Sequence, residues 1–198
     1  MGHIFCLMGK SACGKDTLYN RLINDSTLGL SRIVSYTTRP VREGEKQGVE
    51  YFFTDIEGFT KLKEDGKVIE YRVYHTFYGD WYYFTVDDGS INLAGNDYLY
   101  ISTLESYEKL SVYFGRQAVI PLYIEIDDGI RLERALSRER KQASPKYEEM
   151  CRRFLADSED FCEERLNSLN INERYPNEEL DGCLEKLREK IWTLKSIK

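Results

Sequence analysis

The sequence predicts an α/β protein in which helices cover a parallel β-sheet and a smaller lobe is inserted into the chain. Continuous apolar runs, typical of strands buried on both faces, occur at 4–8, 32–35, 98–102 and 119–126, with helical stretches between or after them. The segment 51–84 instead holds closely spaced aromatic residues in short β-like pieces, which indicates a separate small sheet.

The composition indicates one globular protein. Of its 198 residues, 41% are hydrophobic and 31% are charged, and no window approaches the roughly 18 apolar residues of a membrane span. The N-terminus lacks the basic flank of a signal peptide, so we expect a cytoplasmic protein without a membrane partner. A net charge of −6 argues against nucleic acid as a partner. The five cysteines form no C-x-x-C pair, which predicts reduced thiols.

The first strand, at 4–8, ends at a glycine, and a helix is expected at about 15–23. Between them the chain reads Gly-Lys-Ser-Ala-Cys-Gly-Lys-Asp, which matches the G-x-x-x-x-G-K phosphate-binding loop in the context of strand and helix that this motif requires. The loop therefore predicts a P-loop NTPase-type sheet that binds nucleotide phosphates. The residues expected to contact them are Gly9, Ser11, Ala12, Cys13, Gly14, Lys15, Asp16 and Thr17.

The last element expected is a helix near the C-terminus. Leucine and isoleucine repeat there at spacings of four, three, four and three, which predicts one apolar face. The residues of this face are Leu180, Leu184, Leu187, Ile191 and Leu194.

Two segments follow the loop and read Ser-Tyr-Thr-Thr-Arg-Pro-Val-Arg-Glu-Gly-Glu at 35–45 and Gly-Val-Glu-Tyr-Phe-Phe at 48–53. Together they resemble the GMP-binding segment of guanylate kinases. With the phosphate loop, Val-Ile-Glu at 68–70 and Phe-Tyr-Gly at 77–79, the similarity extends to at least residue 79, and weaker matches reach residue 181.

The resemblance implies a kinase of purine metabolism that transfers the γ-phosphoryl group of ATP to GMP, with Mg²⁺ as cofactor. It also implies a single domain over 1–198, in which 1–34 and 95–198 form the core and 35–94 form a small mixed α/β GMP-binding lobe. A helical lid is expected at about 128–145.

The resemblance assigns the GMP site residue by residue. The GMP phosphate is expected to contact the guanidinium groups of Arg39 and Arg42 and the phenols of Tyr51 and Tyr78, since these donors suit a dianion. Glu70 is expected to accept from N1 and N2 of guanine while Ser35 donates to O6. Guanylate kinases have Asp-Ile-Asp near the end of the next strand, where this chain has no aspartate, and Thr103 lies nearest to the position that contacts the base. The segment 35–45 also contributes Glu45 to the expected GMP site.

The basic segment between 131 and 141 has two interpretations. Its charge pattern alone is typical of a solvated helix face. The resemblance instead implies a lid arginine, for which Arg138 is our candidate and Arg134 and Arg140 compete, and a second arginine at Arg153 on the following helix. Asn177 resembles a residue close to the adenine of ATP and is equally compatible with a helix N-cap.

For catalysis, we expect Lys15, Arg39, Arg138 and Arg153 to neutralise charge as the phosphoryl group moves. The phosphate loop has Asp16 where the motif has Ser or Thr. Our hypothesis is that Asp16, together with Thr17, holds Mg²⁺ in place of the missing strand-end aspartates.

Three alternatives remain open from the sequence. Cys13 is either a small loop residue or a reactive thiol with a lowered pKa. The acceptor is either GMP or another phosphorylated small molecule such as a ribose bisphosphate. A catalytically silent domain that binds protein partners is a different class, against which Lys15 and the lid arginines argue.

Overall fold

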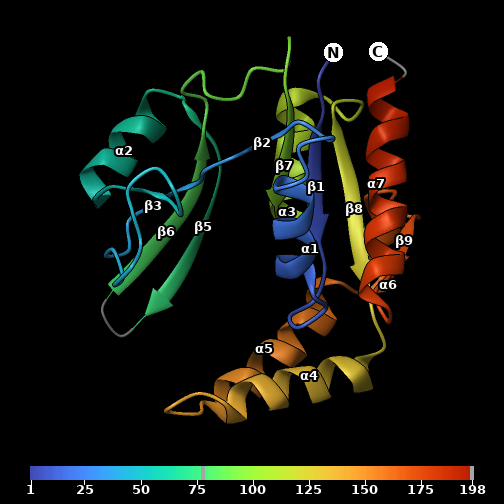
Figure 1. Cartoon of the computed structure of the whole chain (residues 1–198). Coiled ribbons are helices and arrows are strands. Elements are labelled where there is room, and N and C mark those ends of the chain that lie inside the picture. The colour runs from blue at the N-terminus through green and yellow to red at the C-terminus, as the bar shows by residue number, and fades with distance from the viewer. Residues whose placement is uncertain (77–78, 197–198) are drawn as a thin grey trace.

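The computed structural model describes residues 1–76 and 79–196. Figure 1 shows a central parallel sheet with helices on its faces, and a second sheet with its own helix to one side. The helices are α1 Lys15–Ile23, α2 Ile56–Glu64, α3 Leu104–Phe114, α4 Asp128–Arg140, α5 Tyr147–Asp160, α6 Glu163–Ser168 and α7 Leu180–Ser196. The strands are β1 Ile4–Met8, β2 Leu30–Arg32, β3 Tyr36–Thr37, β4 Phe52–Phe53, β5 Val68–Thr76, β6 Gly79–Val86, β7 Asp97–Ile101, β8 Val119–Glu125 and β9 Arg174–Pro176.

The central sheet has the order β2-β7-β1-β8-β9, with every pair parallel. All side chains of β1 are buried and alternate between two apolar clusters. One cluster contains residues of α1 and α7, and the other contains residues of α3 and α6. The α/β prediction and the strand buried on both faces are therefore confirmed, because helices cover both sides of the sheet.

The strand expected at 32–35 is wrong in its position. The strand β2 ends at Arg32, and the next strand, β3, already belongs to the second sheet. Ile33 packs in an apolar cluster of the core, and the hydroxyl of Ser35 is bonded to Tyr100. Residues 33–35 thus lie where the chain passes between the two sheets and belong to neither β2 nor β3.

The second sheet, order β4-β3-β6-β5, comprises strands between residues 36 and 86, inside the lobe expected at 35–94. On one face Phe59 of α2 packs against Tyr82 and Phe84 at ring-centroid distances of 4.4 and 4.9 Å. Because strand side chains alternate, the opposite face presents Glu70, Arg72 and Tyr74 of β5. This second face borders a large cavity.

Beyond the carboxyl ends of the parallel strands, α4 and α5 pack against each other (Figure 1). Arg131 of α4 is fully buried there, with its guanidinium 3.7 Å from the ring centre of Phe154. In α7, Leu187 and Ile191 are fully buried, as the apolar spacing predicts. Within the described residues, no helix is long and apolar enough to cross a membrane.

Candidate active site

The phosphate loop connects β1 to α1 in a conformation that needs its glycines. Gly9 and Gly14 have φ values of 156° and 90°, and Ala12 between them has a φ of 65°. A Cβ atom on Gly14 would lie 2.3 Å from Nδ2 of Asn177. Only glycine avoids both the steric cost of positive φ and this close approach, which explains the spacing of the motif.

Asn177 stabilises the phosphate loop through hydrogen bonds. Its buried side-chain amide donates to the backbone oxygen of Cys13 at 2.7 Å. Its backbone N–H donates to the backbone oxygen of Glu125 at 2.8 Å. The N-cap alternative for Asn177 is wrong, because α7 begins only at Leu180. Asn177 thus joins the end of β8 to the phosphate loop.

Cys13, the loop residue whose backbone oxygen accepts from Asn177, is buried and only 1% exposed. Burial raises the pKa of the Cys13 thiol above its ordinary value, although the charge of Lys15 acts in the opposite direction. The alternative of a reactive thiolate with a lowered pKa is therefore wrong, and Cys13 is a small, buried residue of the loop.

A cavity of about 970 Å³ lies between the phosphate loop, the second sheet and α5. It brings together residues that the sequence analysis assigned to different ligands. From the loop and the acceptor segments come Gly9, Ser11, Lys15, Asp16, Ser35, Arg42, Tyr51 and Thr103, and from α5 comes Arg153.

The Arg39 guanidinium, expected to bind the acceptor phosphate, is paired instead with Glu45. It is 3% exposed, and its two terminal nitrogens donate to the two Glu45 oxygens at 2.7 and 2.5 Å. The Arg39 guanidinium also lies 5.1 Å from the ring centre of Tyr51. Arg39 holds the pKa of Glu45 well below its usual range, at about 2, so the carboxylate stays charged. Tyr78 lies outside the described residues.

Glu70 and Ser35, the two residues expected to read guanine, belong to one buried hydrogen-bond network. Glu70 is 2% exposed and accepts from the hydroxyls of Thr85 at 2.8 Å and Ser106 at 3.0 Å. The hydroxyl of Tyr100 lies 3.0 Å from that of Ser35 and 3.3 Å from that of Thr85. The network thus spans both sheets. The sequence did not identify Thr85 and Tyr100 as members of this network. The pairing register of β5 and β6 places Glu70 opposite Thr85, and this register cannot be read from the sequence.

Thr103, which stands nearest to the base-contacting aspartate of guanylate kinases, has a structural role as well. It is the N-cap of α3, where its hydroxyl oxygen accepts from the N–H of Ser106 at 3.3 Å. It also lines the large cavity, so its side chain remains within reach of a ligand there.

The arginines considered for the lid differ in position. Arg153 of α5 lines the large cavity and forms an ion pair with Glu149 at 3.4 Å. Arg138 and Arg140 are exposed on α4 and line neither of the two cavities described here. Arg134 donates to the backbone oxygen of Asn177 at 3.3 Å and therefore contributes to the support of the loop.

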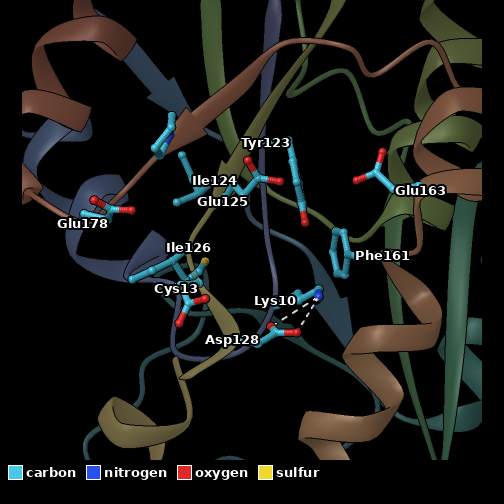
Figure 2. A pocket seen from close by; sticks show the side chains of 12 residues that line it. Lys10, Cys13, Tyr123, Ile124, Glu125, Ile126, Asp128, Phe161, Glu163 and Glu178 are labelled. Carbon is cyan, nitrogen blue, oxygen red and sulfur yellow. Dashed lines mark hydrogen bonds and ion pairs between the residues drawn. The ribbon is translucent and has the colours of Figure 1, made fainter. Parts of the chain in front are cut away.

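A smaller cavity, of about 440 Å³, lies on the other side of the loop, near the ends of β8 and β9 (Figure 2). Figure 2 shows Lys10 bound to Asp128 on its wall, with the nitrogen 3.3 Å from one carboxylate oxygen. Pro176 and Glu178, the neighbours of Asn177, also line this cavity. Lys10 and Cys13 of the loop line this cavity, other residues of the loop line the large one, and Phe161 lines both.

The described residues contain no group of three or more His, Cys, Asp and Glu side chains that could enclose a metal ion. A magnesium ion bound to nucleotide phosphates needs only one or two protein oxygens. Asp16 fits that requirement, because it lines the large cavity beside Lys15. Thr17 is exposed on α1 and does not line this cavity.

A parallel sheet whose central strand leads through a Gly-Lys loop into a helix defines the class of P-loop proteins that bind nucleotide phosphates. The guanylate kinase family model matches residues 1–85. The guanylate kinase of Wolbachia pipientis wMel is 30% identical over 203 residues, covering 96% of this chain and 94% of that protein. The chain belongs to the guanylate kinase family.

Two further comparisons agree. The guanylate kinase of Anaplasma phagocytophilum is 41% identical over 80 residues, a match that spans 40% of this chain and 38% of the relative. The crystal structure of guanylate kinase from the same organism superimposes with a TM-score of 0.61 at 22% identity, covering 97% of this chain and 85% of that chain. This second likeness shows the shared fold.

Proposed function

We propose that the protein transfers the γ-phosphoryl group of ATP to GMP, giving ADP and GDP. One observation carries this proposal: a single cavity adjoins the phosphate loop with Lys15 and also Ser35, which is hydrogen-bonded through Tyr100 to the network around Glu70. A donor phosphate at the loop and an acceptor base near that network would lie on the same cavity.

The work of the chain in this reaction is to position two polyanions and to neutralise their charge. Lys15 neutralises the donor phosphates at the loop, and Arg42 and Arg153, which line the same cavity, neutralise the acceptor and transferred phosphates. Arg39 joins them when the acceptor phosphate replaces the Glu45 carboxylate on its fork, with Arg138 approaching as the lid closes. Asp16 would be the protein oxygen ligand of Mg²⁺ bound with ATP, with Thr17 next to it in the sequence but outside the cavity wall, and the ion would reduce the negative charge of the donor phosphates.

The adenosine half of ATP is proposed to occupy the smaller cavity. Asn177 supports the loop between the two cavities, and its neighbours Pro176 and Glu178 line this one. A nucleotide in that cavity would reach the loop with its phosphates, so the donor and the acceptor would approach the loop from opposite sides.

A second acceptor class, a phosphorylated sugar, has one observation in its favour. The site lacks the aspartate that guanylate kinases use toward the base and has Thr103 and Tyr100 in that region. The buried carboxylate of Glu70 counts against a sugar, since a sugar phosphate has no paired ring donors for it.

The test is the formation of ADP from ATP with GMP, dGMP, AMP or a ribose bisphosphate as acceptor, using the wild type and Lys15→Met. We expect turnover with GMP and a loss of about 100-fold or more in kcat for Lys15→Met, because the cation at the transferred phosphate is gone. The control is Lys61→Met, which removes an exposed cation from α2. Turnover with the ribose bisphosphate alone would reject GMP, and no turnover with any acceptor would favour a silent binding domain.

A further inference from the structure

Arg72 is a cationic side chain of the cavity wall that has no hydrogen-bond partner among the described residues. It lies on β5 two residues after Glu70, lines the large cavity and has a side chain that is only 21% exposed. Its guanidinium donates no hydrogen bond to any described residue, and its Nε is buried. A guanidinium has five N–H donors, and a buried donor without an acceptor costs free energy. An acceptor atom of a ligand in the cavity would therefore form a favourable hydrogen bond with Arg72.

Glu70 does not meet this need. Its Oε2 lies 3.9 Å from Nε of Arg72, which is beyond hydrogen-bonding distance. Both Glu70 oxygens already accept from hydroxyls, those of Thr85 and Ser106. Glu70 is fully buried behind the cavity wall, so only the guanidinium of this pair lines the cavity, and its two terminal nitrogens donate to no described residue.

The guanidinium on the cavity wall matches an acceptor group of guanine. The base has an acceptor, O6, next to a donor, N1–H, and arginine is the side chain most often used to contact O6 and N7. We propose that Arg72 is a specificity-determining residue that donates to O6 of the acceptor guanine. The proposal rests on GMP being the acceptor.

Arg72 replaces Ser35 in the assignment of O6 that the sequence analysis made. The Ser35 hydroxyl lies 3.0 Å from the Tyr100 hydroxyl and is part of the buried network. A hydrogen bond from a charged donor is stronger than one from a neutral hydroxyl. Arg72 therefore accounts for recognition of the 6-oxo group without disturbing the contact between Ser35 and Tyr100.

The alternative ligand for Arg72 is the acceptor phosphate. The carboxylate of Glu70 argues against it, because a phosphate dianion held by Arg72 would lie close to a second negative charge. Arg42 lines the same cavity and Arg39 pairs with a carboxylate, the group that resembles a phosphate most closely. These two arginines suit the phosphate better.

The experiment compares GMP with 6-thio-GMP, in which sulfur, a weak acceptor, replaces O6 while N1–H and N2 remain. Calorimetry gives the dissociation constants of both nucleotides for the wild type, Arg72→Ala and Arg72→Gln. Arg165→Ala is the control, because Arg165 lines a neighbouring pocket with Arg72 but is paired with Asp160 at 2.8 Å. Binding of ADP, together with the thermal midpoint, reports whether each variant is folded.

We expect Arg72→Ala and Arg72→Gln to weaken GMP about 10- to 100-fold and 6-thio-GMP less than about threefold, so that the preference for GMP disappears. Arg165→Ala should keep that preference. If both nucleotides weaken by the same factor, or if neither weakens, Arg72 does not contact O6. If the wild type does not bind GMP at all, the proposed function and the role of Arg72 are both wrong, whereas GMP binding with an unchanged preference rejects Arg72 alone.

Discussion

Asp157 of α5 accepts a hydrogen bond from the backbone N–H of Ser11 in the phosphate loop, at 2.7 Å. The same oxygen accepts from the buried guanidinium of Arg131 at 3.3 Å. Backbone N–H groups of this loop are the donors that surround a bound phosphate. The carboxylate of Asp157 therefore occupies the N–H of Ser11, a donor of the loop that a nucleotide phosphate would otherwise use.

The first prediction concerns this contact. Asp157→Asn keeps an oxygen that can accept from Ser11 but removes the negative charge. We expect ADP to bind about 3- to 10-fold more tightly, since its phosphates no longer compete with a carboxylate at the loop. Calorimetry with Glu159→Gln as control isolates the effect, because Glu159 is exposed on the same helix. Weaker ADP binding by Asp157→Asn would show that Asp157 assists the nucleotide and does not compete with it.

The second prediction concerns the support behind the loop. Gly14→Ala should cost about 2–4 kcal/mol of unfolding free energy, from positive φ and from the approach of its Cβ to Asn177. Asn177→Ala should cost about 1–3 kcal/mol, because the oxygen of Cys13 loses its donor. Since Asn177→Ala also removes the clash, the double variant should lose less than the sum, by about 1 kcal/mol or more. Urea unfolding measures all three.

The control for this coupling is Gly115, whose φ of 89° is also positive, although its ψ of 139° differs from the 6° of Gly14, and whose Cβ would meet nothing within 4 Å. Gly115→Ala therefore carries only the cost of positive φ. Its effect should add to that of Asn177→Ala, and strict additivity for Gly14→Ala as well would contradict the proposed clash.

The third prediction is a pH dependence of stability from the Arg39–Glu45 pair. Arg39 lowers the pKa of Glu45 from 4.5 to about 2, so the unfolded state binds more protons between these values. The stabilisation is complete above about pH 4.5 and decreases as the pH falls toward 2. The thermal midpoint of the wild type should exceed that of Glu45→Gln at pH 7, with the difference shrinking below pH 4.5. The exposed Glu43 provides the control, Glu43→Gln, and a constant difference over the whole range would rule out the pair as its source.

The fourth prediction tests whether Asp16 serves Mg²⁺. Asp16→Ser restores the usual residue of the motif and removes the carboxylate from the cavity wall. If Asp16 compensates for the missing strand-end aspartates, the Mg²⁺ concentration for half-maximal turnover should rise about 10-fold. The same shift should appear in the Mg²⁺ dependence of ATP binding. Asp65→Ser, at an exposed position after α2, is the control, and an unchanged requirement in Asp16→Ser would refute the hypothesis.

Much of the fold could be predicted from local patterns. The continuous apolar run of β1 and the leucine spacing of α7 each describe how one segment meets the core, and both were correct. The strand expected at 32–35 was misplaced, because a buried apolar run looks the same whether it pairs in a sheet or crosses between two sheets. The backbone conformation of the phosphate loop could also be predicted from the sequence, because glycines at fixed spacing indicate positions of positive φ.

The sequence by itself determined the phosphate loop, the parallel core and the segments that resemble an acceptor site, since each is specified by neighbouring residues. Only the tertiary structure decided which side chains contact the residues of the site. Ser11 meets Asp157 across 146 positions of the chain, and the register of β5 and β6 sets Glu70 against Thr85. It also leaves Arg72 beside Glu70 without a hydrogen-bond partner among the described residues. Such pairings depend on how distant segments pack, and this information is not contained in the spacing along any one of them.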